Sequence, residues 1–318
     1  TGTIAVSTGG LTGDETGTIT VSVGALDYVV VEDASGGGGS SVGVVNMTTD
    51  ETRTFHLAGY DQDNNYIHDV NGQRSVQGEI GSISTGTSFV TSTVFTATTI
   101  GSGTVQVDTA SFQDQTGVIT VTGGTLSYLL IRDGTNGGGN EVGDVGITTD
   151  ENLVLYAAGY DADDNYISDV DVSWSVTGNL DNIDPTGVSI EFSPSTAPTA
   201  GTITINSSGL TGDVTGTITV SVGALDYVVV EGASGGGGSP VGTVNMTTDE
   251  TRTFYLAGYD QDNNYIHDIN GQWTVQGAIG IISTGTSFAT STVFTATTIG
   301  NGTVQADTAS FQDQTGVI

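Results

Sequence analysis

Internal repetition is the feature of this sequence that most constrains its fold. The segment GALDYVVVE around Tyr28 recurs unchanged around Tyr227, and the related segment TLSYLLIRD surrounds Tyr128 between them. These tyrosines are 100 and 99 residues apart. A period of about 100 residues is the length of one β-sandwich domain. The chain is therefore predicted to be a tandem array of such domains.

Two of the copies are nearly identical. Residues 25–119 and 224–318 align without a gap and differ at twelve positions, whereas the middle copy is related but diverged. Residues 1–24 match the end of the middle copy, since both contain TGTITVSVG. The order is thus the end of a B copy followed by A, B and A, which suggests part of a longer array. The predicted domains are the C-terminal strands of a preceding repeat (1–24), repeat A (25–123), repeat B (124–222) and a second repeat A (223–318).

The pattern within each copy is that of short β-strands. In TRTFHLAGY, Phe55 and Leu57 face one way and His56 the other, as expected of a strand with one buried face. The segments STVFTATT, GTVQVDT and TGVITVTG alternate in the same manner, with turns between them. About seven such strands in each copy, without helical periodicity, predict an all-β fold of tandem immunoglobulin-like β-sandwich domains. Residues 1–24 are expected to pair with strands of a preceding domain or a neighbour.

Charge and composition exclude several classes of function. The chain has 36 acidic and four basic residues, a formal charge of −32, which argues against binding nucleic acid or an anionic membrane surface. Cysteine is absent, so no disulfide, thiol nucleophile or cysteine-based zinc site is possible. No apolar run reaches the ~18 residues of a membrane span, and no signal peptide opens the chain. We expect a mature or internal part of a secreted protein without membrane insertion.

One set of motifs resembles a known family. AAGYDADDNYISDVDVSWSVTG, a strand like FTATT, and TGTITVSVGALDYVVVE together look like the bacterial Ig-like (Big) domains of surface adhesins. The resemblance covers essentially the whole chain. It implies the sandwich fold, end-to-end stacking and display at the cell surface, and it implies no enzyme activity. In such sandwiches a strand often buries a tryptophan, as expected of Trp174 and Trp273, but the first copy has Arg74 there. Either that position is partly exposed, or the first copy is looser than the third.

An acidic turn in each copy is the best candidate for a site. Oxygen-bearing side chains at alternate positions, followed by a further aspartate, match the first half of an EF-hand loop and suggest calcium. The candidate ligands are Asp61, Asp63, Asn65 and Asp69 in the first copy, Asp161, Asp163, Asn165 and Asp169 in the second, and Asp260, Asp262, Asn264 and Asp268 in the third. Asp50 and Glu51, which recur in all copies, could complete such a site.

The same turn has a simpler interpretation. Tyr66 stands where an EF-hand loop requires glycine, and Gly72 where it requires the bidentate glutamate. A tight connection in which Asn or Asp adopts the left-handed conformation and caps its own backbone explains the same residues. The sequence leaves both interpretations open.

Other motifs suggest little chemistry. The glycine loops, such as ASGGGGSSVG, lack the lysine of a phosphate loop and are expected to be flexible hairpins or close contacts with a neighbouring subunit. Only three histidines occur, too few for a triad or zinc site in each copy, so no enzyme activity is expected. Four N-x-S/T sequons begin at Asn46, Asn206, Asn245 and Asn301 and matter only if the source glycosylates asparagine.

The leading functional hypothesis is an extracellular structural repeat protein that forms a filament or surface layer with other copies of itself. Near-identity of the two A copies supports it, because a lattice needs the same surface presented repeatedly. The alternative is the stalk of a cell-surface adhesin that holds a separate binding tip. Binding of surface glycans by Tyr60 and Tyr66 is a third hypothesis, although both could equally be packing residues.

Overall fold

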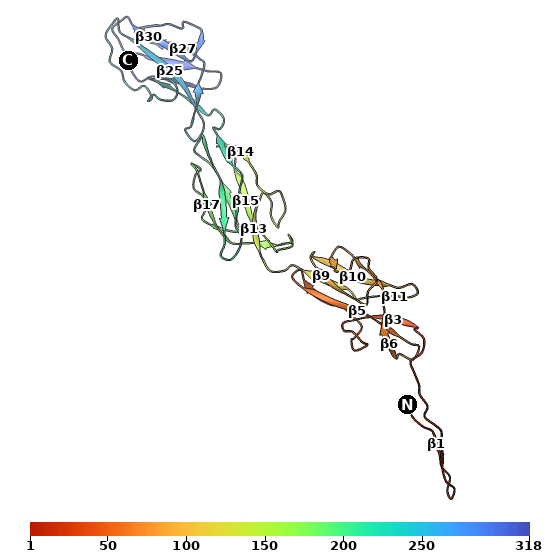
Figure 1. The fold of residues 1–318 in the computed structure, drawn as a ribbon. Coiled ribbons are helices and arrows are strands. Elements are labelled where there is room, and N and C mark those ends of the chain that lie inside the picture. The colour runs from red at the N-terminus through yellow and green to blue at the C-terminus, as the bar shows by residue number, and fades with distance from the viewer. The chain divides into compact units, whose positions relative to one another are not determined.

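The computed structural model describes residues 1–318, which form β-strands joined by turns and loops and contain no helix (Figure 1). No segment therefore provides a helix long and apolar enough to cross a membrane. The chain divides into two compact units, Thr1–Tyr128 with Tyr160–Ile167, and Leu129–Gly159 with Ser168–Ile318. A loop of the middle copy thus belongs to the same unit as the first copy.

Residues 1–24 form an exposed hairpin. Strand β1 (Ala5–Val6) pairs antiparallel with β2 (Asp14–Glu15), and an isolated bridge joins Gly2 to Ile19. Every residue from 1 to 24 is exposed to solvent. Pairing of this segment with strands of a preceding repeat stays a prediction.

The first A copy is built from two sheets that face each other across a core. One sheet has the strand order β3-β5-β9-β8, with β6 also paired to β5, and the other has the order β11-β10-β12-β4, with β7 also paired to β10. In the second sheet β12 runs parallel to β4, and the other pairs are antiparallel. The strands are β3 (Tyr28–Glu32), β4 (Val45–Thr48), β5 (Thr52–Tyr60), β6 (Tyr66–Asp69), β7 (Gln73–Gln77), β8 (Gly81–Ile83), β9 (Ser92–Ala97), β10 (Gly101–Asp108), β11 (Gln113–Gln115) and β12 (Ile119–Thr122).

The core of this copy follows the predicted alternation. Phe55 and Leu57 on β5 are fully buried, and the ring of Phe55 lies 6.4 Å from that of Phe95 on β9. Val105 and Val107 on β10 complete the opposite side of the same core. The alternation predicted from sequence is confirmed, and burial of these side chains provides the main stabilisation of the sandwich.

The second unit contains most of the B copy and the whole second A copy, each with its own core. The structure confirms the predicted fold class. The strands of the B copy are β13 (Tyr128–Arg132), β14 (Val145–Thr148), β15 (Leu153–Tyr160), β16 (Tyr166–Asp169), β17 (Val172–Val176), β18 (Thr186–Gly187), β19 (Ser189–Phe192), β20 (Thr199–Gly201), β21 (Ile203–Asn206), β22 (Asp213–Val214) and β23 (Ile218–Ser221). Those of the second A copy are β24 (Tyr227–Glu231), β25 (Thr251–Tyr259), β26 (Tyr265–Asp268), β27 (Gly271–Gln276), β28 (Gly280–Ile282), β29 (Phe288–Ala289), β30 (Ser291–Ala296), β31 (Thr303–Asp307) and β32 (Gln312–Gln314).

The tryptophan position is buried in all three copies. Trp174 and Trp273 are 3% and 1% exposed, and Arg74 in the first copy is 2% exposed. Partial exposure of Arg74, one of the two explanations suggested by the sequence, is therefore wrong. The strand carries this position into the core whichever residue occupies it, because β7, β17 and β27 pair in the same way with β10, β21 and β31.

Candidate functional site

The first aspartate of the acidic turn organises its own loop. Asp161 is fully buried, and its Oδ1 accepts hydrogen bonds from the backbone N–H groups of Asp163 (3.0 Å) and Asn165 (2.9 Å). Asp164 between them has a φ of 66°, in the left-handed region that Asn and Asp tolerate. This is the self-capped turn that the sequence suggested as the simpler interpretation.

The other oxygen of the same carboxylate contacts the preceding copy. Asp161 Oδ2 accepts a hydrogen bond from the hydroxyl of Thr49, at 2.6 Å, and from the backbone N–H of Gly124, at 3.2 Å. Thr49 belongs to the first copy, and Gly124 begins the connection to the second. Beside them, Asp50 Oδ2 accepts the N–H of Thr125 at 2.6 Å. One buried carboxylate therefore ties its own loop, the connection and the end of the preceding domain together.

Asn165 adds a second group of contacts within the same unit. Its side-chain amide donates to the carbonyl of Thr98 (2.9 Å) and accepts from the N–H of Ile100 (3.3 Å), both in the turn between β9 and β10. A side chain at Gly123 would collide with Ile167, since a Cβ there would lie 2.4 Å from Ile167 Cδ1. These contacts explain why residues 160–167 form one compact unit with the first copy.

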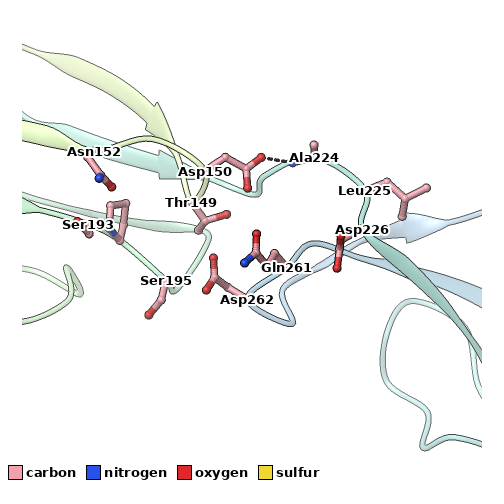
Figure 2. Close-up of a pocket in the computed structure, with 11 residues that line it drawn as sticks. Thr149, Asp150, Asn152, Ser193, Ser195, Ala224, Leu225, Asp226, Gln261 and Asp262 are labelled. Atoms are coloured by element: carbon pink, nitrogen blue, oxygen red, sulfur yellow. Dashed lines mark hydrogen bonds between the residues drawn. The ribbon is translucent and has the colours of Figure 1, made fainter.

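The second unit repeats this arrangement between the B copy and the second A copy (Figure 2). Asp260 is fully buried, and its Oδ2 accepts the hydroxyl of Thr149 at 2.8 Å and the N–H of Gly223 at 3.1 Å. Asp150 accepts the N–H of Ala224 at 2.6 Å, the bond drawn as a dashed line in Figure 2. We refer to these two sets of contacts, around Asp161 and around Asp260, as the junctions.

Asp61 in the first copy makes the loop half of the same arrangement. Its Oδ2 accepts the N–H of Gly24 at 2.8 Å, and its Oδ1 accepts the N–H groups of Asp63 (3.1 Å) and Asn65 (2.8 Å). Asp61 is 4% exposed. The contacts with a preceding copy, which Thr49 and Asp50 or Thr149 and Asp150 supply at the junctions, have no counterpart at Asp61.

Hydrogen bonding keeps the junction carboxylates ionised. Burial raises the pKa of Asp161, but hydrogen bonds from Thr49, Asn165 and Gly124 outweigh burial and lower the pKa below its usual range. The pKa of Asp260 is lowered by the same balance. For Asp61 the N–H of Gly24 is the main cause of a lowered pKa. A carboxylate that accepts several N–H and O–H donors is stabilised in its charged form.

The fourth residue of each predicted calcium set lies in a different part of the fold. Asp69 accepts hydrogen bonds from the hydroxyl of Tyr66 (2.9 Å) and from the N–H of Gly36 (3.1 Å) in the glycine loop. Asp268 repeats these contacts with Tyr265 and Gly235. In the B copy Asp169 accepts the N–H of Asn136. The structure therefore groups Asp61 with Asn65 and assigns Asp69 to the glycine loop.

The glycine loop packs within its own copy. Gly36 and Gly37 have φ angles of 74° and 64°, and a Cβ on Gly37 would lie 2.4 Å from the ring of Tyr66. Only glycine permits this contact. The backbone of the loop thus covers the Tyr66 ring, and an antiparallel bridge between Glu32 and Ser41 joins the two ends of the loop as in a hairpin. Flexibility of this hairpin and its contact with a neighbouring subunit stay predictions.

The tyrosines of each copy form a stacked cluster. The rings of Tyr28 and Tyr60 stack at 5.4 Å, and Tyr66 meets Tyr60 edge-on at 6.0 Å. The hydroxyl of Tyr60 donates to Glu32, and that of Tyr66 donates to Asp69. These hydroxyls are therefore engaged within the domain, as expected of packing residues. Glycan binding by Tyr60 and Tyr66 stays a prediction.

No group of three or more acidic or histidine side chains is arranged to hold a metal ion. The side chains of Asp63, Asp163 and Asp262 are exposed. Asp262 lies with Asp150 and Asp226 around an open cavity of about 560 Å³ beside the second junction (Figure 2). Both oxygens of Asp61, Asp161 and Asp260 already accept hydrogen bonds. The geometry favours the turn interpretation, and calcium binding stays a prediction.

Thermal melting in EDTA, calcium and magnesium tests that prediction. If the turns bind calcium in the folded state only, a tenfold excess over Kd would add about 1.4 kcal/mol of stability per site. The rise should be specific to calcium and should shrink in Asp63→Ala, whose side chain is exposed and outside the junctions. Identical melting temperatures in all three solutions would contradict calcium binding and leave the self-capped turn as the interpretation.

The partner of the acidic turn, the threonine of the preceding copy, has no direct signal in the sequence. Thr49 and Thr149 lie in the motif TTDE, which occurs in all three copies. It directly precedes β5 in the first copy, Asn152 in the second and β25 in the third. From the sequence alone, Asp50 is expected only as a further calcium ligand. Repetition of TTDE was the available signal, but it does not show that the motif meets the turn of the following copy.

Comparison with known proteins adds structural likenesses only. No family model and no curated protein matches the chain. It is similar to the Escherichia coli adhesin FdeC, with 14% identity, coverage of 94% of this chain and 99% of that chain, and a TM-score of 0.39. It is also similar to extracellular domains 3–5 of Drosophila OTK. The identity is 8%, the match covers 91% of this chain and 97% of that chain, and the TM-score is 0.31.

A third similar structure is that of the surface layer protein SbsC, domains 4–9. Identity is 13%, coverage is 96% of this chain and 52% of that chain, and the TM-score is 0.25. The matches thus include a bacterial adhesin and a surface-layer protein. The tandem-sandwich architecture rests on the strand pairing of the chain itself.

Proposed function

We propose that this chain is an extracellular structural repeat protein whose consecutive copies are joined by buried aspartates, and that it forms a filament or surface layer with other copies of itself. One observation carries the proposal: the same threonine–aspartate hydrogen bond joins A to B at Thr49–Asp161 and B to A at Thr149–Asp260. A buried, charge-assisted bond of this kind resists separation of consecutive domains better than an exposed linker does.

The two junctions are alike although the A and B copies have diverged. Each contains the threonine hydroxyl, the glycine N–H and the neighbouring aspartate bound to the connection. Repeat proteins are stabilised by the interfaces between neighbours in addition to the repeats themselves. Because the same contacts recur at both junctions, they support a structural role that depends on the connection between domains. We propose no catalytic function.

The extracellular location is supported by the resemblance of the sequence motifs to bacterial Ig-like domains. Like-charged chains with 36 acidic residues also require counter-ions to pack side by side. Assembly is therefore expected to depend on ionic strength or divalent cations.

Negative-stain microscopy of the native material tests this proposal against the alternative of an adhesin stalk. Ordered fibres or sheets with a constant axial repeat support a filament or surface layer. Isolated particles at all protein and salt concentrations would contradict it and favour a stalk. Assembly is repeated at increasing salt concentration, because salt screens the repulsion between the acidic chains. Chains that associate only at high salt are held apart by charge, whereas chains that never associate lack an assembly surface.

A further inference from the structure

Arg74 is a buried arginine that lacks partners for most of its donors. Its Nη1 donates to the carbonyls of Gly72 and Val90, whereas Nε and Nη2 are buried with no hydrogen-bond partner. The side chain is 2% exposed. A buried charge without a counter-ion and with unmade hydrogen bonds is among the most destabilising features that a core can contain.

Arg74 remains charged at neutral pH in this position. Burial lowers its pKa from 12.5 to about 10, and burial is the only cause of that change. No nearby carboxylate compensates it. The first copy therefore folds around an ionised guanidinium that water would solvate better.

The other copies place tryptophan at the same point. The indole N–H of Trp273 donates to the carbonyl of Ala289 at 2.9 Å, and that of Trp174 donates to Gly187 at 2.8 Å. Val90, which accepts from Arg74, is the counterpart of Ala289. Arginine therefore keeps the one hydrogen bond of the indole and adds a bond to Gly72, but it also brings a charge and two nitrogens, Nε and Nη2, whose three N–H groups have no partner.

Neighbouring substitutions adjust the space around this position. Val107 lies opposite Arg74 on β10, and its counterpart Ala306 lies opposite Trp273 on β31. Three of the twelve differences between the A copies are thus one linked exchange: Arg74, Val90 and Val107 in the first copy replace Trp273, Ala289 and Ala306 in the third. Neither valine supplies a partner for the charge of Arg74.

We infer that the first A copy is the domain of this chain that opens first, and that it acts as an extension point while the other two sandwiches stay folded. The extension role rests on the proposed function of a tandem array under tension. Opening would release about 3.3–3.6 Å of contour length per residue. The order of opening itself follows from the core of the first copy and does not depend on assembly.

Amide hydrogen exchange of the 318-residue chain in dilute solution tests the order of opening. Strands β9 and β30 have the same sequence, STVFTA, so their intrinsic exchange rates match and any difference reports the stability of each copy. We expect β9 to exchange at least about tenfold faster than β30. The free-energy cost of an unpaired buried charge exceeds the free energy that corresponds to a tenfold change in the equilibrium between closed and open states.

Three variants assign the difference to Arg74. The triple variant Arg74→Trp, Val90→Ala and Val107→Ala copies the third core into the first and should bring the rate of β9 to that of β30. The reverse change, Trp273→Arg, should raise the rate of β30. Glu79→Ala, another of the twelve differences but at an exposed position, should change neither rate.

Equal rates in the unaltered chain, or an unchanged rate ratio in the triple variant, would overturn the inference. Neither result would affect the filament proposal, since no assembly occurs in dilute solution. Conversely, absence of filaments in microscopy leaves the exchange ratio as it is. Urea unfolding gives a second readout, because the first copy has no tryptophan: circular dichroism should fall before tryptophan fluorescence changes.

Discussion

Replacing Asp161 by alanine is expected to lower the free energy of unfolding of the middle copy by roughly 3 kcal/mol or more, since each buried donor left without an acceptor costs roughly 1–3 kcal/mol. The carboxylate accepts N–H groups from Asp163, Asn165 and Gly124 and the hydroxyl of Thr49. Urea unfolding measures the loss. Hydrogen exchange should show faster exchange in two places, the turn itself and the end of the first copy.

Thr49→Val is the matched control for this variant. It removes the hydrogen bond between copies and leaves the bonds of Asp161 within its own turn. We expect a smaller loss, about 2 kcal/mol, as for a single hydrogen bond to a charged group. Protection should fall at the junction and persist at the amides of Asp163 and Asn165. No loss in Thr49→Val beside the full loss in Asp161→Ala would show that the carboxylate serves its own loop and adds nothing to the connection.

Raising the pH above 10 is expected to unfold the sandwiches through their tyrosines. The hydrogen bond from Tyr60 to Glu32 raises the pKa of Tyr60 to about 12, and burial, with a hydrogen bond to Asp164, raises that of Tyr128 to about 12. The pKa of Tyr259 is raised as well, by burial and by its bond to Glu231. Between pH 10 and about 12 these tyrosines therefore stay protonated in the folded protein, whereas the same tyrosines lose their protons in the unfolded chain.

The sign of the effect follows from linkage. A tyrosine with a raised pKa contributes its full stability below the unfolded value of 10.0 and loses that contribution as the pH rises to about 12. Absorbance of tyrosinate and circular dichroism should therefore change together in this window. Tyr60→Phe should reduce the alkaline loss in the first copy, at the cost of lower stability at neutral pH because Glu32 loses its donor. Titration of all tyrosines near pH 10 without unfolding would contradict the prediction.

Much of the fold could be predicted because its determinants are local. Alternation placed Phe55 and Leu57 in the core, and the repeat indicated three related domains. The left-handed turn was one of the two interpretations that the Asn and Asp residues left open, and Asn64, Asp164 and Asn263 all have positive φ angles. Such patterns depend on side-chain direction and on the conformational preferences of single residues, which a sequence shows directly.

The junctions could not be predicted in this way. The hydrogen bond from Thr49 to Asp161 joins residues 112 positions apart, in different copies. The spacing of acidic residues suggested a metal because proximity in sequence was taken as proximity of side chains, whereas Asp69 turns toward the glycine loop. Arg74 is a further example: the strand pattern placed it in β7, but its burial and its exchange with Val90 and Val107 depend on packing between sheets.

Each copy carries both halves of a junction. The threonine and aspartate of TTDE stand at one end of the domain, and the acidic turn stands at the other, so an A copy meets a B copy through the same residues in either order. A gene duplication or deletion that adds or removes whole copies would therefore leave every remaining junction intact. The length of the array can change by recombination between near-identical segments, with no compensating mutation at the new connection.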